Sequence, residues 1–145
     1  MRLEFRRLDP QVPLPSTAHE GDAGLDLRAW ADLVVDPGRR AMIPTGLAVA
    51  IPEGHAGLVL PRSGLASRTG LTLANAPGLI DSGYRGELTI AVVNLDRVEP
   101  VKISRGDRIA QLVVVPFVPV EPIAVDELAA TTRGEAGFGS TGVGS

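Results

Sequence analysis

The sequence contains no cysteine, and only two of its 145 residues are histidine. The missing thiols exclude disulfide bonds, cysteine zinc sites and thiol nucleophiles. His19 and His55 are too few for a typical zinc site built on imidazole. The ligands that remain are oxygen atoms, which suit a hard cation such as Mg²⁺.

The sequence also has no excess of basic residues over acidic ones. Fourteen Lys and Arg stand against 17 Asp and Glu, so the charge balance does not favour binding to nucleic acid or to an anionic membrane. No run of about 18 apolar residues occurs, and residues 1–15 lack the apolar region of a signal peptide. We therefore expect a cytoplasmic protein with no nucleic-acid or membrane partner, which meets any anionic ligand through a few local side chains.

Proline and glycine are frequent, with 12 and 17 copies spread along the chain. They divide it into short segments with alternating or β-branched apolar residues, and residues 63–69 favour one short helix with Ser63 as N-cap and Gly70 as its end. This spacing predicts a single all-β domain, a jelly-roll-like sandwich or distorted barrel. The expected strands are residues 2–8, 25–29, 33–35, 41–51, 57–60, 71–73, 87–95, 98–103 and 109–115.

The last part of the chain differs in composition. Prolines recur in residues 116–125, which favours an arm laid across a neighbour, and one helical turn is expected over 126–130. Residues 131–145 hold five glycines and almost no core-forming residues. We predict a core over residues 1–130 and a flexible glycine-rich arm over 131–145.

Residues 74–88 combine several turn formers with one acid and one aromatic residue. Asp81 follows two aliphatic residues, and Tyr84 lies three residues later. Taken alone, the segment predicts a tight β-hairpin whose acid caps its own turn. The turn formers are Asn75, Pro77, Gly78, Gly83 and Gly86.

Four further clusters pair glycine with polar residues that a phosphate or a base could use. They are Asp-Ala-Gly-Leu-Asp-Leu (22–27), Pro-Arg-Ser-Gly-Leu-Ala (61–66), Gly-Asp-Arg-Ile-Ala-Gln-Leu (106–112) and Arg-Gly-Glu-Ala-Gly-Phe-Gly-Ser-Thr-Gly (133–142). With residues 74–88 in third place, their order and spacing resemble the five motifs of the trimeric dUTP pyrophosphatases (dUTPases). The resemblance covers residues 22–142, most of the chain.

The resemblance implies a jelly-roll enzyme that hydrolyses dUTP to dUMP and pyrophosphate with Mg²⁺, which keeps uracil out of DNA and supplies dUMP for thymidylate synthesis. Asp81 would hold the attacking water and accept its proton. Asp26 would lie near Mg²⁺ and act through water, with the metal held mainly by the substrate phosphates. The structural alternative for Asp26 is an acid at a strand end or turn.

The resemblance also implies the residues that bind substrate. The backbone around Gly78 and the Asn75 amide would recognise uracil, and Tyr84 would pack under deoxyribose, although an isolated Tyr can serve packing alone. The triphosphate would contact Arg62, Ser63, Gly64 and Gln111. Arg133 would reach the γ-phosphate, and Phe138, with Gly139 and Ser140, would close over the base as part of the arm.

Part of this assignment follows from the residues themselves. A helix start just after Arg62 favours an anion through its free backbone N–H groups and dipole, although a Ser there can also be a simple cap. Gln111 lies inside the apolar strand expected at 109–115, where an amide needs a polar partner.

The resemblance further implies a homotrimer with sites at subunit boundaries. One chain would give the first, second and fourth motifs, a second chain residues 74–88, and a third chain its tail. One departure concerns Gly83, because many family members carry a second acid there, two residues after the catalytic Asp.

Two other functions are compatible with the same fold. A dCTP deaminase, or a bifunctional relative, would carry a catalytic Glu seven residues after the aromatic residue, where this chain has Ala91. A non-catalytic nucleotide-binding regulator would keep the binding contacts without the attacking group, and the presence of Asp81, Arg133 and Phe138 argues against it.

Overall fold

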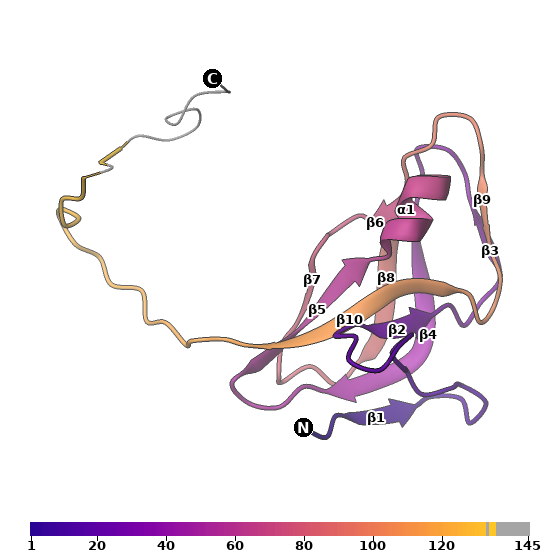
Figure 1. Ribbon diagram of the computed structural model, residues 1–145, viewed down its shortest axis with the longest axis horizontal. Coiled ribbons are helices and arrows are strands. Elements are labelled where there is room, and N and C mark those ends of the chain that lie inside the picture. Colours follow the sequence, from indigo (N-terminus) through magenta and orange to yellow (C-terminus); the bar gives the residue numbers. More distant parts are fainter. Residues whose placement is uncertain (133, 136–145) are drawn as a thin grey trace.

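The computed structural model describes residues 1–132, 134 and 135 (Figure 1). In this part of the chain, short strands follow one another with a single helix between the fifth and sixth. The elements are β1 (Glu4–Arg7), β2 (Leu25–Arg28), β3 (Leu33–Val35), β4 (Arg40–Ala50), β5 (His55–Pro61), α1 (Ser63–Thr69), β6 (Leu71–Leu73), β7 (Gly78–Ile80), β8 (Glu87–Asn94), β9 (Val101–Ile103) and β10 (Arg108–Pro116).

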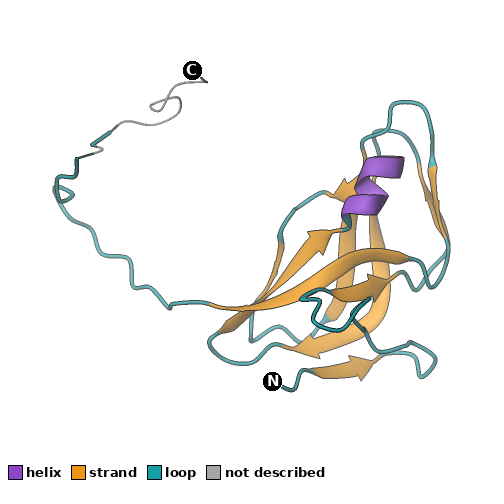
Figure 2. Ribbon diagram, in the orientation of Figure 1, coloured by secondary structure: helices purple, strands orange, loops and turns teal. Residues whose placement is uncertain are grey.

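The strands form two four-stranded antiparallel sheets and a small ribbon (Figure 2). One sheet has the order β1-β4-β8-β6, the other has the order β2-β10-β5-β7, and β3 pairs with β9 alone. The predicted all-β, jelly-roll-like fold with one short helix is confirmed. None of the helices in the described part of the chain is long and apolar enough to cross a membrane.

The core is aliphatic and lies between the two sheets. Along β8 the burial alternates, so that Leu88, Ile90 and Val92 face inward while Thr89 is exposed. Inward residues of the opposite sheet, such as Leu27 and Leu112, are fully buried against them. Each such side chain stabilises the fold by about 1.5–3 kcal/mol.

Asn94 is the one fully buried amide among the described residues and ties three segments together. Its Nδ2 donates to the carbonyl oxygens of Val35 and Glu99, both at 2.9 Å, and its Oδ1 accepts from the backbone N–H of Asp96 at 2.9 Å. The amide therefore joins the end of β8 to β3 and to the turn that precedes β9.

We expect Asn94→Leu to lower the free energy of unfolding by about 3 kcal/mol, because two carbonyls and one N–H would lose their partner inside the protein. Urea unfolding at fixed protein concentration measures the change. Val98→Ala, on the same turn at a side chain that is 75% exposed, is the control and should shift stability by less than about 0.5 kcal/mol. Equal midpoints for Asn94→Leu and the parent protein would contradict this role.

The turn before β9 shortens the strand expected at residues 98–103. The Asp96 carboxylate accepts hydrogen bonds from the backbone N–H groups of Val98 and Glu99, both at 2.8 Å. These bonds lower the pKa of Asp96, with the Glu99 amide contributing most. Backbone donors used in this turn are not available for a strand, so β9 starts only at Val101.

Residues 74–88 do not form the predicted tight hairpin. β7 pairs with β5 in one sheet, whereas β8 pairs with β4 and β6 in the other. The antiparallel partner of β8 on this side is β6, with Leu71 opposite Asn94 and Leu73 opposite Val92. The segment is thus a connection that leaves one sheet, adds a strand to the other and returns, and it closes the edge of the sandwich between them.

The chain leaves the body after β10. The last backbone hydrogen bond to the body runs from Phe117 N to Gly54 O at 3.0 Å. Residues 117–132 then extend away without helix or strand (Figure 1). The helical turn expected at 126–130 is therefore absent, and these residues are exposed, without the packing against other described residues that so short a helix needs.

Candidate active site

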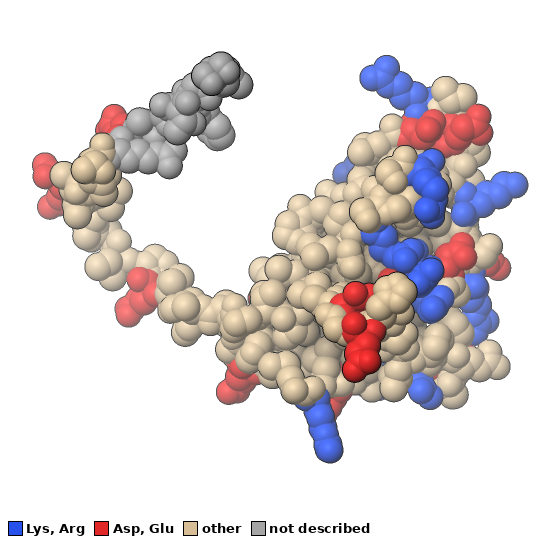
Figure 3. Space-filling view, viewed as in Figure 1, with Lys and Arg blue, Asp and Glu red and all other residues tan. Residues whose placement is uncertain are grey.

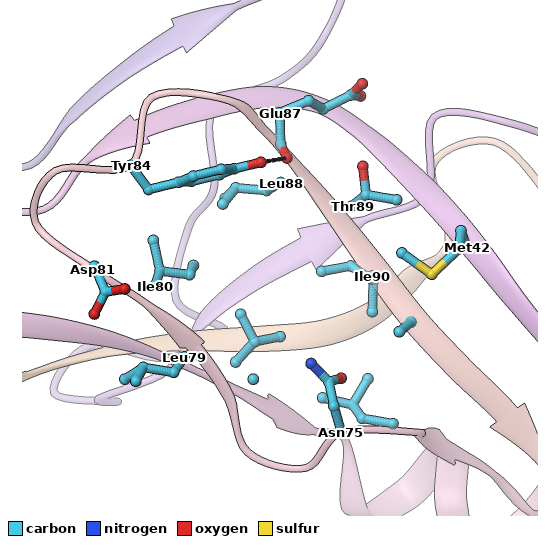
Figure 4. Close-up of a pocket in the computed structure, with 14 residues that line it drawn as sticks. Met42, Asn75, Leu79, Ile80, Asp81, Tyr84, Glu87, Leu88, Thr89 and Ile90 are labelled. Atoms are coloured by element: carbon cyan, nitrogen blue, oxygen red, sulfur yellow. Dashed lines mark hydrogen bonds between the residues drawn. The ribbon is translucent and has the colours of Figure 1, made fainter.

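A cavity of about 290 Å³ opens at the edge of the sandwich that residues 74–88 close (Figure 4). Asn75, Gly78, Asp81 and Tyr84, all predicted from the sequence as site residues, line it together. In Figure 4 the Asn75 amide points into the cavity from one side, the Tyr84 ring lies on the other side, and Asp81 lies at the end next to Tyr84.

Close packing fixes the backbone of this cavity. A Cβ added at Gly78 would lie 3.3 Å from Cβ of Val59 and 3.4 Å from Nδ2 of Asn75, so glycine lets β7 approach β5. A Cβ at Gly86 would collide with the Tyr84 hydroxyl. The cavity wall is therefore backbone as much as side chain, which suits recognition of a flat polar ring.

The loop that carries Asp81 is braced by its own side chains. Tyr84 N donates to Asp81 O at 3.1 Å, and the Tyr84 hydroxyl donates to Glu87 O at 2.9 Å. The Arg85 guanidinium donates to the carbonyls of Ser82 and Tyr84 at 2.6 and 2.8 Å. These contacts hold the Tyr84 ring and the Asp81 backbone in a fixed relation.

The two acids that line this cavity, Asp81 and Glu87, differ in their hydrogen-bond partners. The Asp81 side chain is exposed, and within the described residues no hydrogen bond or ion pair engages its carboxylate. Glu87 accepts a hydrogen bond from Gly46 N at 2.8 Å, and its carboxylate points away from the cavity (Figure 4). Asp81 is thus the carboxylate that is ready to hold a water and accept a proton.

A second cavity, of about 430 Å³, collects the other predicted site residues of the body. Asp26, Arg62, Ser63, Gly64 and Gln111 all line it. It lies where β2, β10 and β5 meet the start of α1. Ala18, Asp22, Ala23, Gly24, Leu60 and Val113 complete the lining.

Asp26 lies between two arginines in this second cavity. Its Oδ1 is 3.0 Å from Nε of Arg62, and its Oδ2 is 3.2 Å from Nη1 of Arg108. The Asp26 side chain is only 11% exposed, compared with 26% for Arg62 and 42% for Arg108. Two guanidinium groups thus flank the Asp26 carboxylate, and because a second carboxylate, Asp22, also lines the cavity, the four charges cancel.

Gln111 has a defined position because of a glycine. Its Nε2 donates to Pro61 O at 3.0 Å, which satisfies one of the two amide hydrogens. A Cβ at Gly24 would collide with Oε1 of Gln111, so only glycine allows the amide to lie where it does. Sequence reasoning assigned no role to Gly24 or to Arg108, although both lie inside clusters that it singled out.

The start of α1 differs from the prediction in one detail. Arg62 occupies the N-cap position, with φ −92° and ψ 118°, and no side chain caps the helix. Ser63 is therefore the first helical residue and not the cap. The helix ends as predicted, at Gly70 in the left-handed conformation with φ 71°.

The two cavities lie on opposite faces of β5 and share no lining residue. Val59 faces the Asp81 cavity, and its neighbour Leu60 faces the Arg62 cavity. Adjacent residues of a strand point to opposite sides of the sheet. One chain therefore presents the two halves of the predicted site on separate surfaces.

Charges of both signs lie on the body, and Asp and Glu also form groups on the face that Figure 3 shows. Figure 3 shows Lys and Arg around α1 and the β3–β9 ribbon, whereas the extended segment after β10 carries only Asp and Glu on this face. No group of three or more His, Cys, Asp or Glu able to hold a metal occurs among the residues that the structure describes. The predicted contacts of Arg133, Phe138, Gly139 and Ser140 lie outside the described residues.

This all-β domain thus has a carboxylate without a partner among the described residues in one cavity, and an ion-paired arginine beside a helix start in the other. A dUTPase family model matches residues 10–142. A deoxyuridine 5'-triphosphate nucleotidohydrolase from Mycobacterium marinum is 58% identical to the chain and covers 94% of it, and the chain covers 92% of that relative. The chain belongs to the dUTPase family, and the predicted dUTP diphosphatase class is confirmed.

Two solved structures are similar to the whole fold. Staphylococcus bacteriophage 80alpha dUTPase with dUpNHpp superposes with a TM-score of 0.91 at 34% identity, covering 98% of this chain and 99% of its own. A mutant dUTPase from phage phi11 of S. aureus, whose structure concerns the coordination of a structural Mg(II) ion, has a TM-score of 0.80 at 32% identity and covers 88% of this chain and 98% of its own.

Proposed function

We propose that this enzyme hydrolyses dUTP to dUMP and pyrophosphate by in-line attack of water at the α-phosphorus, with Asp81 as the base. The free Asp81 carboxylate, next to a cavity of backbone and amide groups, is the observation that carries the proposal. We place the reaction in the cytoplasm, where it would keep uracil out of DNA and supply dUMP for thymidylate synthesis.

The step is a direct displacement without a covalent intermediate. The water oxygen forms a bond to the α-phosphorus as the bond from that phosphorus to the bridging oxygen breaks. Asp81 accepts the proton of the water, and pyrophosphate leaves with the electron pair of the broken bond. A carboxylate on a braced loop is suited to this task because the water must lie opposite the leaving group.

Base and sugar would occupy the Asp81 cavity. The Asn75 amide and the backbone near Gly78 offer hydrogen-bond donors and acceptors to the edge of uracil. The Tyr84 ring, held by its bond to Glu87 O, would lie under deoxyribose and leave no room for a ribose 2′-hydroxyl. Thymine would be rejected if its methyl group met the backbone at Gly78, which packs closely against Val59 and Asn75.

The triphosphate would bind to the Arg62 cavity. Arg62 and Gln111 provide side-chain donors, and the backbone N–H groups of Ser63 and Gly64 lie at the helix start beside them. A fixed arginine fork matches phosphate oxygens well. The chain has a net charge of −3, and Asp22 and Asp26 also line the cavity, so Mg²⁺ together with these aimed donors would be needed to offset the charge of the triphosphate.

Mg²⁺ fits this cavity as an ion held mainly by substrate phosphates. Both Asp26 oxygens contact arginines, but each keeps a lone pair that can accept a hydrogen bond from a metal-bound water. When bound, the ion would neutralise phosphate charge and stabilise the leaving pyrophosphate. Asp26 is our choice for the water-mediated contact.

We also propose a homotrimer in which neighbouring chains complete each site. The two cavities on opposite faces of β5 support this arrangement, since dUTP bound to one cavity of a chain would find the other cavity on a neighbour. Arg133 and the Phe138 to Ser140 part of the arm would come from a third chain and close over the nucleotide.

The nearest alternative is deamination of dCTP, and the carboxylate that would act as its general base is missing from this cavity. Ala91 lines the cavity where a deaminase of this fold would place its catalytic Glu. The neighbouring acid Glu87 is already bonded to Gly46 N. Attack of water on a cytosine ring would therefore have no carboxylate beside it other than Asp81.

One experiment separates these functions. The protein is incubated in turn with dUTP, dCTP, dTTP and UTP, with and without Mg²⁺, and both pyrophosphate and ammonia are assayed. Pyrophosphate from dUTP alone, and only with Mg²⁺, is the expected result. Ammonia from dCTP would indicate a deaminase, and neither product would indicate a nucleotide-binding regulator.

Replacing Tyr84 tests the proposed exclusion of ribose. Tyr84→Ala is expected to raise kcat/KM for UTP relative to dUTP by about 10-fold or more, because the ring no longer fills the space of the 2′-hydroxyl. Tyr84→Phe, which keeps the ring and loses the bond to Glu87 O, is the matched control and should change the ratio much less. An unchanged ratio in Tyr84→Ala would leave Tyr84 a packing residue only.

A further inference from the structure

The carboxylate of Asp26 is fixed from two sides. One oxygen contacts Arg62 Nε at 3.0 Å and the other accepts from Arg108 Nη1 at 3.2 Å. The two arginines come from different places in the fold, the end of β5 and the start of β10. With the Asp26 side chain only 11% exposed, neither oxygen is free to rotate away without breaking an ion pair.

The two arginines do not have the same relation to the cavity. Arg62 is among its lining residues, whereas Arg108 is not. Because Asp26 engages Nε of Arg62, most of the terminal N–H groups of that guanidinium remain available, with one long contact of 3.4 Å from Nη1 to Arg108 O. The Arg108 side chain is therefore linked to Arg62 through Asp26, whereas its backbone oxygen accepts only the long contact from Arg62 Nη1.

A β-bulge in β10 places Arg108 beside Asp26. The register with β2 shifts between Arg108 and Ala110, so that Arg108 lies opposite Arg28 while Ala110 lies opposite Leu27. Ile109 and Ala110 are consequently both buried, and the alternation restarts with Gln111 on the outer face, opposite Asp26. A bulge of this kind re-aims side chains, and here it puts Arg108 and Gln111 on the same side of the strand.

We propose that Arg108 is a positioning residue for the triphosphate site, which fixes Asp26 so that Asp26 aims the Arg62 guanidinium into the cavity. Arg108 also offsets part of the negative charge at the cavity, where Arg62 alone would stand against the carboxylates of Asp26 and Asp22. Without Arg108 the Arg62–Asp26 pair would be neutral and free to turn. The inference rests on the proposed binding of phosphate by Arg62.

The test compares ligands with and without phosphates. In Arg108→Met, the dissociation constant for dUpNHpp, measured by calorimetry with Mg²⁺, is expected to rise about 10-fold, the effect of one weakened charge-assisted contact. Affinity for deoxyuridine, which carries no phosphate, should stay unchanged. Arg108→Lys should recover part of the loss, since it restores charge but not the planar fork. Arg97→Met, an exposed arginine outside both cavities, is the control with the same charge change and should bind both ligands normally.

A double-mutant cycle distinguishes positioning from a direct contact. Because Arg108 acts through Arg62, adding Arg108→Met to an Arg62→Met protein should change dUpNHpp affinity by less than about 2-fold. The same 10-fold loss in both backgrounds would overturn the inference and make Arg108 an independent ligand. Parallel loss of deoxyuridine binding, or a lowered unfolding midpoint with no ligand selectivity, would make its role structural and overturn the inference as well.

The outcome for Arg108 is separable from that for the proposed function. If the unmodified protein releases no pyrophosphate from dUTP, the proposed function fails whatever the variants do. If it is active and Arg108→Met binds dUpNHpp as tightly as the unmodified protein does, only the positioning role fails.

Discussion

Asp81→Asn is expected to slow pyrophosphate release from dUTP by about 10²–10⁴-fold, the range that follows loss of a positioned base. Asparagine has nearly the same shape and can still hold a water, but its amide cannot accept the proton. Binding of dUpNHpp should change little, since no described contact of the Asp81 carboxylate holds the cavity together. Steady-state kinetics and calorimetry with the analogue measure the two quantities separately.

The control for this prediction is Asp36→Asn. Asp36 is exposed on the turn between β3 and β4 and lines neither cavity, so the variant has the same change of charge and should keep its activity. Turnover of Asp81→Asn within a few-fold of the unmodified enzyme would remove Asp81 from the base role. Glu87 would not be a ready replacement, because its Oε1 is engaged by Gly46 N.

Local signals made the positions of most elements predictable from the sequence. The helix at Ser63–Thr69 and its end at Gly70 follow from residues within one turn of each other. The strand β8 follows from its apolar and β-branched residues between turn formers, and the structure buries alternate residues of it, Leu88, Ile90 and Val92, on one face. The short strand β7 was missed because three residues carry no period, and its partner β5 lies some 20 residues away along the chain.

The site residues themselves were predictable only because five short motifs occur in a known order. Their grouping into two cavities was not, since it depends on which faces of β5 they occupy. Asp26 illustrates the limit: its partner Arg108 is 82 positions away along the chain, and the bulge that brings them together depends on pairing with β2. The adjacent apolar residues Ile109 and Ala110 gave no distinct signal for that bulge, because residues 112–115 of the same strand are also consecutive apolar residues.

The bulge in β10, the connection formed by residues 74–88 and the start of α1 have a common consequence. They give each chain one cavity next to Asp81, where we propose that base and sugar bind, and another around Arg62 on the opposite face of β5. If both cavities bind parts of one nucleotide, a single chain does not bring them together as it is folded here. Assembly of chains would then be a condition of catalysis and not only of stability.

Mixing two inactive variants tests this condition directly. Asp81→Asn and Arg62→Met each damage a different cavity, so either variant alone should be nearly inactive. After the two are unfolded together and reassembled, each shared site of the proposed trimer would draw Arg62 from one chain and Asp81 from its neighbour. About half of the chains carry an intact Arg62 and the other half carry an intact Asp81. A shared site needs one of each from neighbouring chains, so about one quarter of the sites should be intact. About one quarter of the normal activity should therefore return.

The matched control mixes two lesions of the same cavity. Asp81→Asn and Asn75→Ala both lie in the cavity that one chain builds, so no neighbour can supply the missing partner and activity should not rise above that of the better variant. If the Asp81→Asn and Arg62→Met mixture also stays inactive although mixed trimers form, each site uses a single chain. In that case the segment 74–88 would have to move around the edge of β5 to meet the phosphates, a rearrangement that its pairing with β5 opposes.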